Sequence, residues 1–280
     1  MFPPADPSPR AIESLLAFWA DAGVDASYAD TTIDRTAAAA QPPGTRRTPP
    51  ARPAAVAAPL PVAVAPAPAP VPVVGQAIDD ARRAANGATD LAALEQAIAA
   101  FDGCPLKIAG ARRAVFARGA PDAPVMIIGE APGADEDAQG APFVGRAGQL
   151  LDRMLAAAGL TGRVFVTNTV FWRPPGNRTP TPAEQALCAP FLDRAIALVN
   201  PRLLLLVGGA SAKAMLKTAD GILSLHGRWF EWRSSDGALE IPALPTLHPA
   251  FLLRQPAAKK KSWEDLLTLT ERLDRKERPG

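Results

Sequence analysis

Apolar runs alternate with amphipathic segments along most of the chain. Residues 125–129 and 201–208 are nearly continuous in apolar side chains, which is typical of strands covered on both faces of a parallel sheet. Residues 163–170 predict a further strand, and residues 146–158 and 183–199 carry apolar side chains at helical spacing. This alternation predicts an α/β fold in three layers: a doubly wound, mainly parallel central sheet flanked by helices.

Shorter elements complete the pattern. Residues 76–100 predict two helices separated at Asn86-Gly87, with Thr89 or Asp90 capping the second. Thr181 is expected to cap the helix at 183–199. Further strands are expected over 115–118, 228–232 and 239–244, and further helices over 210–216 and 262–277.

The first 75 residues have a different character. Residues 9–23 carry apolar side chains at helical spacing, whereas 11 of the 31 prolines of the chain fall within 42–72. Proline removes backbone donors and fixes φ, so this proline-rich stretch predicts a disordered linker. We expect an N-terminal helical segment at 1–35, a linker at 36–75 and a folded domain at 76–280. The sequence leaves open whether the N-terminal helix docks on a protein partner or folds back on the domain.

Composition narrows the classes of function. The net charge is +2, so the chain as a whole is not a polycation. Two cysteines cannot form a disulfide framework and favour a reducing compartment. No apolar run is long enough to span a membrane, and the N-terminus lacks the features of a signal peptide. We therefore expect a cytoplasmic protein that does not interact with membranes.

The segment 129–151, GEAPGADEDAQGAPFVGRAGQLL, joins a predicted strand to a predicted helix. A glycine-rich loop in this position directs backbone N–H groups at a ligand. Its carboxylates argue against a site for phosphate alone and favour the placing of water or the recognition of a polar ring. Ligands of doubly wound sheets bind beyond the carboxyl ends of the strands, so the loops at 129–145, 168–182 and 246–254 are expected to share one cleft.

Three segments in these loops carry a resemblance to a known family. The segments GEAPGADEDAQGAPFVGRAGQLL, TNTVFWRPPGNRTPTPAE and LHPAFLLR resemble, in this order, the signature segments of the family 4 uracil-DNA glycosylases. The resemblance covers roughly residues 100–275 and implies a catalytic domain of this fold at 76–280. It implies hydrolysis of the N-glycosidic bond of uracil in DNA, with no metal ion in the chemistry, which leaves an abasic site for base excision repair.

The resemblance also implies roles for individual residues. Phe143 would stack on the flipped-out base, Asn168 would read its polar edge, and His248 would stabilise the departing anion near O2. The uracil pocket would further include Gly129, Ala131, Gly133 and Glu136, and Glu130 would help to place water. Physical chemistry supports these roles, because an amide matches uracil O4 and N3–H, and a donor at O2 acts most strongly in the transition state.

Each residue also has a structural interpretation. Taken alone, Asn168 is typical of a strand end, His248 of a turn, and Phe143 of a core position. Glu136 and Asp137 together are typical of a solvated charge run. The surrounding motifs favour the pocket.

Basic and apolar residues near the three loops are candidates for contacts with DNA. Arg173, Arg178 and Arg254 flank the expected cleft and suit contacts to phosphates, with a solubility role as the alternative. Leu252 and Leu253 either fill the gap left by a flipped base or pack in the core. We expect a monomer that acts on uracil-containing DNA.

Cofactor binding is where this chain departs from the family it resembles. The family usually holds a 4Fe-4S cluster on four cysteines, and the matching positions here are Phe101, Cys104, Trp172 and Cys188. Two thiolates cannot complete such a cluster, so we expect no cluster and no other cofactor. Phe101 and Trp172 would fill the volume, and Cys104 and Cys188 would be buried free thiols.

A second function is possible within the same superfamily. The chain would then be a module that binds uracil-containing or abasic DNA without excision, or that traps its product covalently. Trapping requires a nucleophile, often a histidine, in the loop at 176–180, and this loop contains no histidine. The sequence therefore favours turnover.

Overall fold

The computed structural model describes residues 74–275. The predicted segment at 1–35 and nearly all of the predicted linker at 36–75 lie outside the described residues. The first described helix, α2, begins at Val74, close to the predicted start of the folded domain.

The domain is built on a mixed sheet of six strands in the order β1-β3-β2-β4-β6-β5. The pairs β3–β2, β2–β4 and β4–β6 are parallel, and the edge strands β1 and β5 are antiparallel to their neighbours. The predicted α/β fold with a mainly parallel sheet is confirmed. The strands are β1 Ala117–Gly119, β2 Val125–Gly129, β3 Val164–Asn168, β4 Leu203–Val207, β5 Phe230–Arg233 and β6 Glu240–Thr246.

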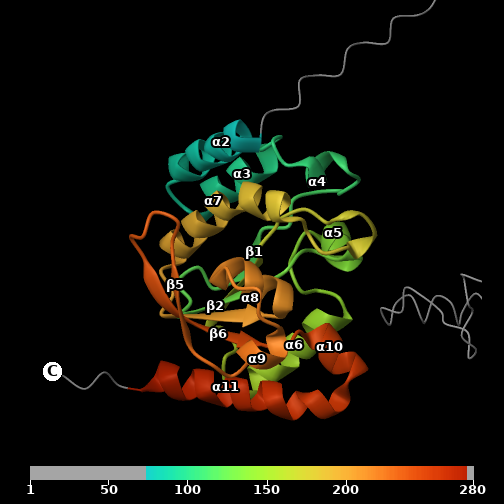
Figure 1. The fold of residues 1–280 in the computed structure, drawn as a ribbon, viewed down its shortest axis with the longest axis vertical. Helices are drawn as coiled ribbons and strands as arrows, with labels where there is room; N and C mark the ends of the chain where they lie inside the picture. Colours follow the sequence, from blue (N-terminus) through green and yellow to red (C-terminus); the bar gives the residue numbers. More distant parts are fainter. Residues whose placement is uncertain (1–73, 276–280) are drawn as a thin grey trace, which may run out of the picture. The chain divides into compact units, whose positions relative to one another are not determined.

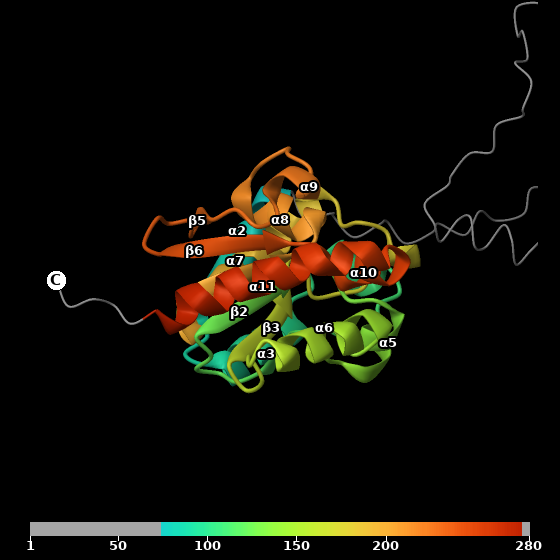
Figure 2. The same ribbon diagram turned by 90° about the horizontal axis from the view of Figure 1, so that it is seen from below.

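Helices cover both faces of this sheet, with α2, α3 and α7 on one side and α6 and α11 on the other (Figures 1 and 2). The longer helices are α2 Val74–Gly87, α3 Leu91–Ala100, α6 Arg146–Ala157, α7 Pro182–Val199, α8 Gly209–Leu216 and α11 Lys259–Asp274. The short ones are α4 Pro105–Ile108, α5 Ala134–Gln139, η2 Pro175–Asn177, α9 Ile222–Leu225, α10 Pro249–Arg254 and η3 Pro256–Ala258.

The core follows the alternation of side chains along the strands. Met126 and Ile128 of β2 pack in the cluster that includes α2, α3 and α7. Val125 and Ile127 of the same strand pack in the cluster on the opposite face, with α6 and α11. Both faces of β2 are therefore buried from solvent, which explains why the strand consists of a nearly continuous apolar run.

The predicted caps are formed as expected. Asp90 caps α3 by accepting a hydrogen bond from the Ala93 N–H at 2.8 Å. Thr181 and Glu184 form a reciprocal capping box at the start of α7.

All three segments that the sequence analysis treats as loops contain short helices, and the one in 168–182 is η2. Helix α5 lies within 129–145, where Gly133 is its N-cap and the Glu136 side chain accepts from the Gly133 N–H. Helix α10 begins at Pro249, directly after His248, because proline is well suited to the first turn of a helix. Both helices are too short to show a periodic pattern in the sequence. Strand β1 also lies further along than predicted, at Ala117–Gly119.

Candidate active site

Four parallel strands, β3, β2, β4 and β6, end side by side at one edge of the sheet. Gly129 at the end of β2 is in register with Asn168 at the end of β3, and Val207 of β4 is in register with Thr246 of β6. His248 follows two residues after Thr246. The predicted convergence of the loops at 129–145, 168–182 and 246–254 on one edge therefore holds for their first residues.

Gly129 marks the point where the site residues meet. A Cβ atom at this position would lie 2.4 Å from Asn168 Oδ1 and 2.5 Å from Phe143 Cζ. Glycine is thus required here because the Phe143 ring and the Asn168 amide both pack against its backbone. The ring of Phe143 also lies beside that of His248, with their centroids 5.9 Å apart.

Asn168 is only 1% exposed, and its neighbours fix the end of its strand. The Thr167 hydroxyl donates to the Phe116 carbonyl at 2.7 Å, and the Thr169 hydroxyl donates to the Glu130 carbonyl at 2.7 Å. The Thr169 N–H also donates to the Gly129 carbonyl at 2.9 Å. Backbone on both sides of the Asn168 amide is therefore held in place.

His248 is oriented by the helix that it caps. Its Nδ1 accepts a hydrogen bond from the Ala250 N–H at 3.1 Å. A ring nitrogen that accepts from an N–H carries no proton, so the neutral ring has its proton on Nε2. Gly208, at φ +93°, lies behind the ring, since a Cβ there would come within 3.0 Å of His248 Cβ.

The surroundings of His248 keep it neutral. Burial lowers the pKa of His248 from 6.5 to about 4, the Arg254 charge lowers it too, and the Glu136 carboxylate acts in the opposite direction. The site thus presents a neutral imidazole with an Nε2–H donor at physiological pH.

A buried carboxylate that the sequence analysis missed anchors the strand before His248. Asp265 of α11 accepts a hydrogen bond from the Thr246 hydroxyl at 2.7 Å, and its other oxygen lies 3.4 Å from His226 Nδ1. Burial raises the pKa of Asp265. The signal in the sequence is a carboxylate on the apolar face of a predicted helix, between the buried Ser262 and Leu269. His226 is accordingly part of a structural network with Asp265 and Thr246.

The carboxylates of the loop after β2 differ in what they contact. Glu136 accepts from three backbone N–H groups: Gly133 at 3.0 Å, Val144 at 3.0 Å and Gly145 at 2.9 Å. Asp137 is buried and accepts from the Arg112 N–H at 2.8 Å. Glu130 is half-buried. It lies with Ala131 and Gly133 in the segment that follows directly after β2.

Comparisons with known proteins agree with this arrangement. A family model described as the uracil DNA glycosylase superfamily matches residues 116–267. The chain belongs to the uracil DNA glycosylase superfamily.

Several proteins named type-4 uracil-DNA glycosylase are similar to this chain. That of Pyrobaculum aerophilum is 40% identical over 182 residues, which are 63% of this chain and 91% of that protein. That of Sulfurisphaera tokodaii is 39% identical over 164 residues, 56% of this chain and 74% of the relative. That of Thermotoga maritima is 38% identical over 156 residues, 54% of this chain and 77% of the relative. The resemblance found in the three sequence segments is confirmed.

The superfamily region from 116 to 267 contains Phe143, Asn168 and His248.

The arginines near the site differ in the contacts that they make within the domain. Arg173 donates to the Asn177 side chain at 2.7 Å, whereas Arg178 forms two hydrogen bonds with Glu184, at 2.7 and 2.9 Å. Arg254 is exposed at the end of α10.

Leu252 and Leu253 differ in their environments. The sequence left open whether they pack in the core or fill the gap left by a flipped base. Leu252 is fully buried in a small cluster with Leu150 and Leu247, so it is a core residue. Leu253 is 36% exposed and remains available for contact with a ligand.

The positions that match the four cluster cysteines lie in one apolar core. Phe101, Cys104, Trp172 and Cys188 are all buried in the cluster that also contains Phe191. The ring of Phe101 packs edge-on against Phe191 at 5.2 Å, and both cysteines are free thiols. Burial raises the pKa of the Cys188 thiol well above its ordinary value, whereas the side-chain hydrogen bond with Cys188 lowers the pKa of Cys104. Two of the four matching positions are aromatic, so the residues present do not fit a four-cysteine cluster. Within residues 74–275, the structure shows no group of three or more Asp, Glu, His or Cys side chains arranged to hold a metal ion.

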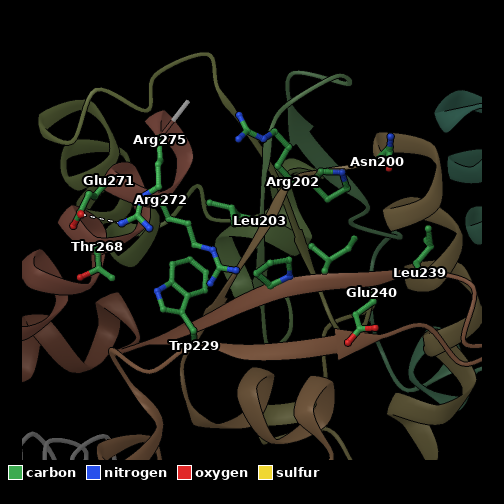
Figure 3. Close-up of a pocket in the computed structure, with 13 residues that line it drawn as sticks. Asn200, Arg202, Leu203, Trp229, Leu239, Glu240, Thr268, Glu271, Arg272 and Arg275 are labelled. Carbon is green, nitrogen blue, oxygen red and sulfur yellow. Dashed lines mark hydrogen bonds and ion pairs between the residues drawn. The ribbon is translucent and has the colours of Figure 1, made fainter. Parts of the chain in front are cut away.

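A broad hollow of about 1230 Å³ lies away from the site (Figure 3). Its lining includes Leu203 and Glu240, at the first residues of β4 and β6, so it faces the opposite edge of the sheet from Gly129 and Asn168. Its arginines are engaged within the domain: the Arg272 guanidinium lies 4.2 Å from the Trp229 ring centroid, and Arg275 pairs with Glu271 at 3.2 Å. The candidate active site is thus defined by the strand ends and not by this hollow.

None of the helices described over residues 74–275 has the length and apolar character needed to cross a bilayer.

Proposed function

We propose that this chain hydrolyses the N-glycosidic bond of uracil in DNA, releasing free uracil and leaving an abasic site. Its membership of the superfamily and its similarity to proteins named type-4 uracil-DNA glycosylase support this activity. The observation that carries the proposal is the meeting of Phe143, Asn168 and His248 around Gly129, where the parallel strands end.

We assign recognition of the base to Phe143, Asn168 and the backbone from Gly129 to Gly133. An extruded base is commonly held by stacking on an aromatic ring and by hydrogen bonds to its polar edge. The Asn168 amide supplies one acceptor for N3–H and one donor for O4, whereas cytosine presents the reverse pattern. Thr167 and Thr169 hold the backbone on either side of Asn168, which supports this assignment because recognition requires a side chain that extends from a fixed position.

We assign stabilisation of the leaving group to His248. As the C1′–N1 bond breaks, negative charge accumulates on uracil, including O2, and the sugar becomes oxocarbenium-like. A neutral imidazole with its proton on Nε2 is a donor whose hydrogen bond to O2 strengthens as this charge develops. Glu130 is the loop carboxylate that we assign to the placing of water and to stabilisation of the sugar cation.

We assign Glu136 to positioning rather than to direct contact with the base, because its oxygens accept three backbone N–H groups of the loop. Arg173 and Arg254 are the better candidates for contacts to phosphate, since Arg178 is held by Glu184. Phosphate contacts of this kind position DNA without reading its sequence.

We further propose that the protein acts as a monomer and without a cluster. All the site residues come from one chain, and apolar packing of Phe101 and Trp172 occupies the matching ligand positions. The N-terminal segment at 1–35 would then serve a protein partner, and a protein lacking residues 1–73 should excise uracil as fast as the full chain. Iron analysis of protein purified under anaerobic conditions tests the cofactor proposal, and four bound irons per chain would refute it.

Excision itself is tested with end-labelled oligonucleotides, single- and double-stranded, that contain one uracil. Cleavage by alkali after incubation reports abasic sites on a gel, and a thymine oligonucleotide is the control. Tight binding of uracil DNA without alkali-labile sites would instead identify the non-excising module. A covalent protein–DNA adduct would identify the product-trapping module.

A further inference from the structure

Phe143 adopts a backbone conformation that its side chain does not favour. Its φ is +56°, in the left-handed region where bulky residues are rare. Such a conformation persists only where the surrounding structure imposes it. The contacts around the Phe143 backbone therefore show what holds the ring beside Asn168 and His248.

Arg118 of the edge strand β1 binds this backbone from one side. Its Nε donates to the Pro142 carbonyl at 2.8 Å, and its Nη2 donates to the Phe143 carbonyl at 3.3 Å. Asp152 of α6 accepts from the same Nη2 at 2.6 Å and fixes the plane of the guanidinium. Two successive carbonyls are thus bound by one rigid fork of donors, an arrangement that a lysine ammonium cannot reproduce.

The opposite side of the same backbone is closed as well. A Cβ on Gly148 would lie 1.8 Å from the Phe143 carbonyl oxygen, so α6 packs directly against this peptide. Glu136 holds the two following N–H groups, those of Val144 and Gly145. The Phe143 peptide is therefore held on its carbonyl side by Arg118 and on its downstream side by Glu136.

Strand pairing connects Arg118 to the other recognition residue. Arg118 is in register with Val166 of β3, two residues before Asn168. The strand that carries the uracil-reading amide and the side chain that holds the aromatic ring thus belong to one hydrogen-bonded unit.

We infer that Arg118 is a positioning residue for excision: it fixes the Phe143 ring in the orientation that stacks on the extruded base. This inference rests on the proposed function. It assigns to Arg118 an effect on the chemical step that passes through Phe143, and no contact with DNA.

The first test compares Arg118→Ala with a matched control, Arg163→Ala. Arg163 forms an ion pair of the same length, 2.6 Å to Asp274, with similar exposure but outside the site. Under single-turnover conditions with saturating enzyme, Arg118→Ala should lower the excision rate roughly 10- to 100-fold, the effect expected of a displaced binding group. Arg163→Ala should leave the rate unchanged, affinity for undamaged DNA should be the same in both, and Arg118→Lys should recover part of the loss.

The decisive test is a double-mutant cycle with Phe143→Ala. If Arg118 acts only through the ring, then Arg118→Ala should have no further effect in the Phe143→Ala background. Losses that multiply, or an Arg118→Ala variant as fast as the wild type, would overturn the inference. An equal loss of affinity for undamaged DNA would also overturn it, because Arg118 would then contact phosphate.

These outcomes are distinct from failure of the proposed function, in which the wild-type protein itself would excise no uracil. Circular dichroism and thermal unfolding establish that each variant is folded. Should Arg118→Ala not fold, the same cycle with Arg118→Lys or Asp152→Asn decides the question, because both loosen the fork and retain the rest of the chain.

Discussion

The protonation state of His248 is the prediction from this structure that can be tested most directly. We expect a neutral ring with its proton on Nε2, because Nδ1 accepts the Ala250 N–H. We also expect the pKa of His248 to lie at about 4, because the ring is buried and the Arg254 charge is nearby. The perturbations are Arg254→Gln, which removes that charge, and His248→Gln, which removes the titrating group.

The expected loss of stability at acidic pH follows from the lowered pKa of His248. The folded-state pKa lies below the ordinary value of 6.5, so between these two values the unfolded chain binds a proton that the folded chain does not. The contribution of this ring to stability is therefore constant at neutral pH and is lost as pH falls from 6.5 towards 4. At about 1.4 kcal/mol per pKa unit, the loss reaches about 2 kcal/mol at about pH 5 and about 3 kcal/mol in full.

Nuclear magnetic resonance measures the ring directly. The chain has only two histidines, and a His226→Gln variant assigns the remaining signals to His248. Nitrogen shifts should report the Nε2–H tautomer, and the titration midpoint should rise in Arg254→Gln. Urea unfolding at neutral pH and at about pH 5 should show the predicted loss in the wild type relative to His248→Gln, since all other titrating groups are common to both.

Two results would refute this reasoning. A His248 signal that titrates near 6.5 would show that the ring is neither desolvated nor influenced by Arg254. An Nδ1–H tautomer would show that the Ala250 hydrogen bond does not exist, and the donor to O2 would then have to be sought elsewhere.

Three further variants test the packing behind the site. Gly208→Ala places a Cβ at φ +93° against His248 and should lower the free energy of unfolding by about 1–3 kcal/mol, with a parallel loss of excision; an unchanged rate would contradict the close packing. Thr246→Val removes the hydrogen bond to the buried Asp265 and should cost about 1–3 kcal/mol in urea unfolding, whereas no change would mean that Asp265 finds another donor. Trp172→Ala should cost about 3–5 kcal/mol because the indole is fully buried, and a cost no larger than that of the more exposed Trp263→Ala would contradict its core role.

Much of the fold was predictable because burial on both faces leaves a clear trace in the sequence. Strand β2 was predicted with its observed bounds. Thr181 was identified as a cap from residue type and position alone, and the cap of α3 was narrowed to Thr89 or Asp90, of which the structure shows Asp90. The edge strand β1 was misplaced by two residues at its start, since its side chains are only partly buried and carry no periodic pattern. Helices α5 and α10 were missed because a single turn or two of helix gives too few positions for periodicity.

The candidate site was predictable as a set of residues but not as a set of contacts. Phe143, Asn168 and His248 were identified from three motifs, and the structure places them together. The contacts of Arg118 and Asp265 come from elements distant in the sequence, so only the fold brings them to the site. The same is true of Gly208, whose requirement depends on the position of His248.

The four carboxylates of the loop show how the structure separates scaffold from chemistry. Glu136 and Asp137 are bound by backbone N–H groups, and Asp135 faces the start of α6, where a Cβ on Gly145 would lie 2.7 Å from its carboxylate. Glu136 is thus held by N–H groups of the loop and Asp137 by the Arg112 N–H outside it, while a carboxylate near a helix N-terminus, such as Asp135, is stabilised by the helix dipole. Glu130 is the remaining one, half-buried and directly after the strand end at Gly129. This position at the strand end supports our proposal that Glu130, rather than the exposed Asp135, is the carboxylate that meets water or the developing sugar cation.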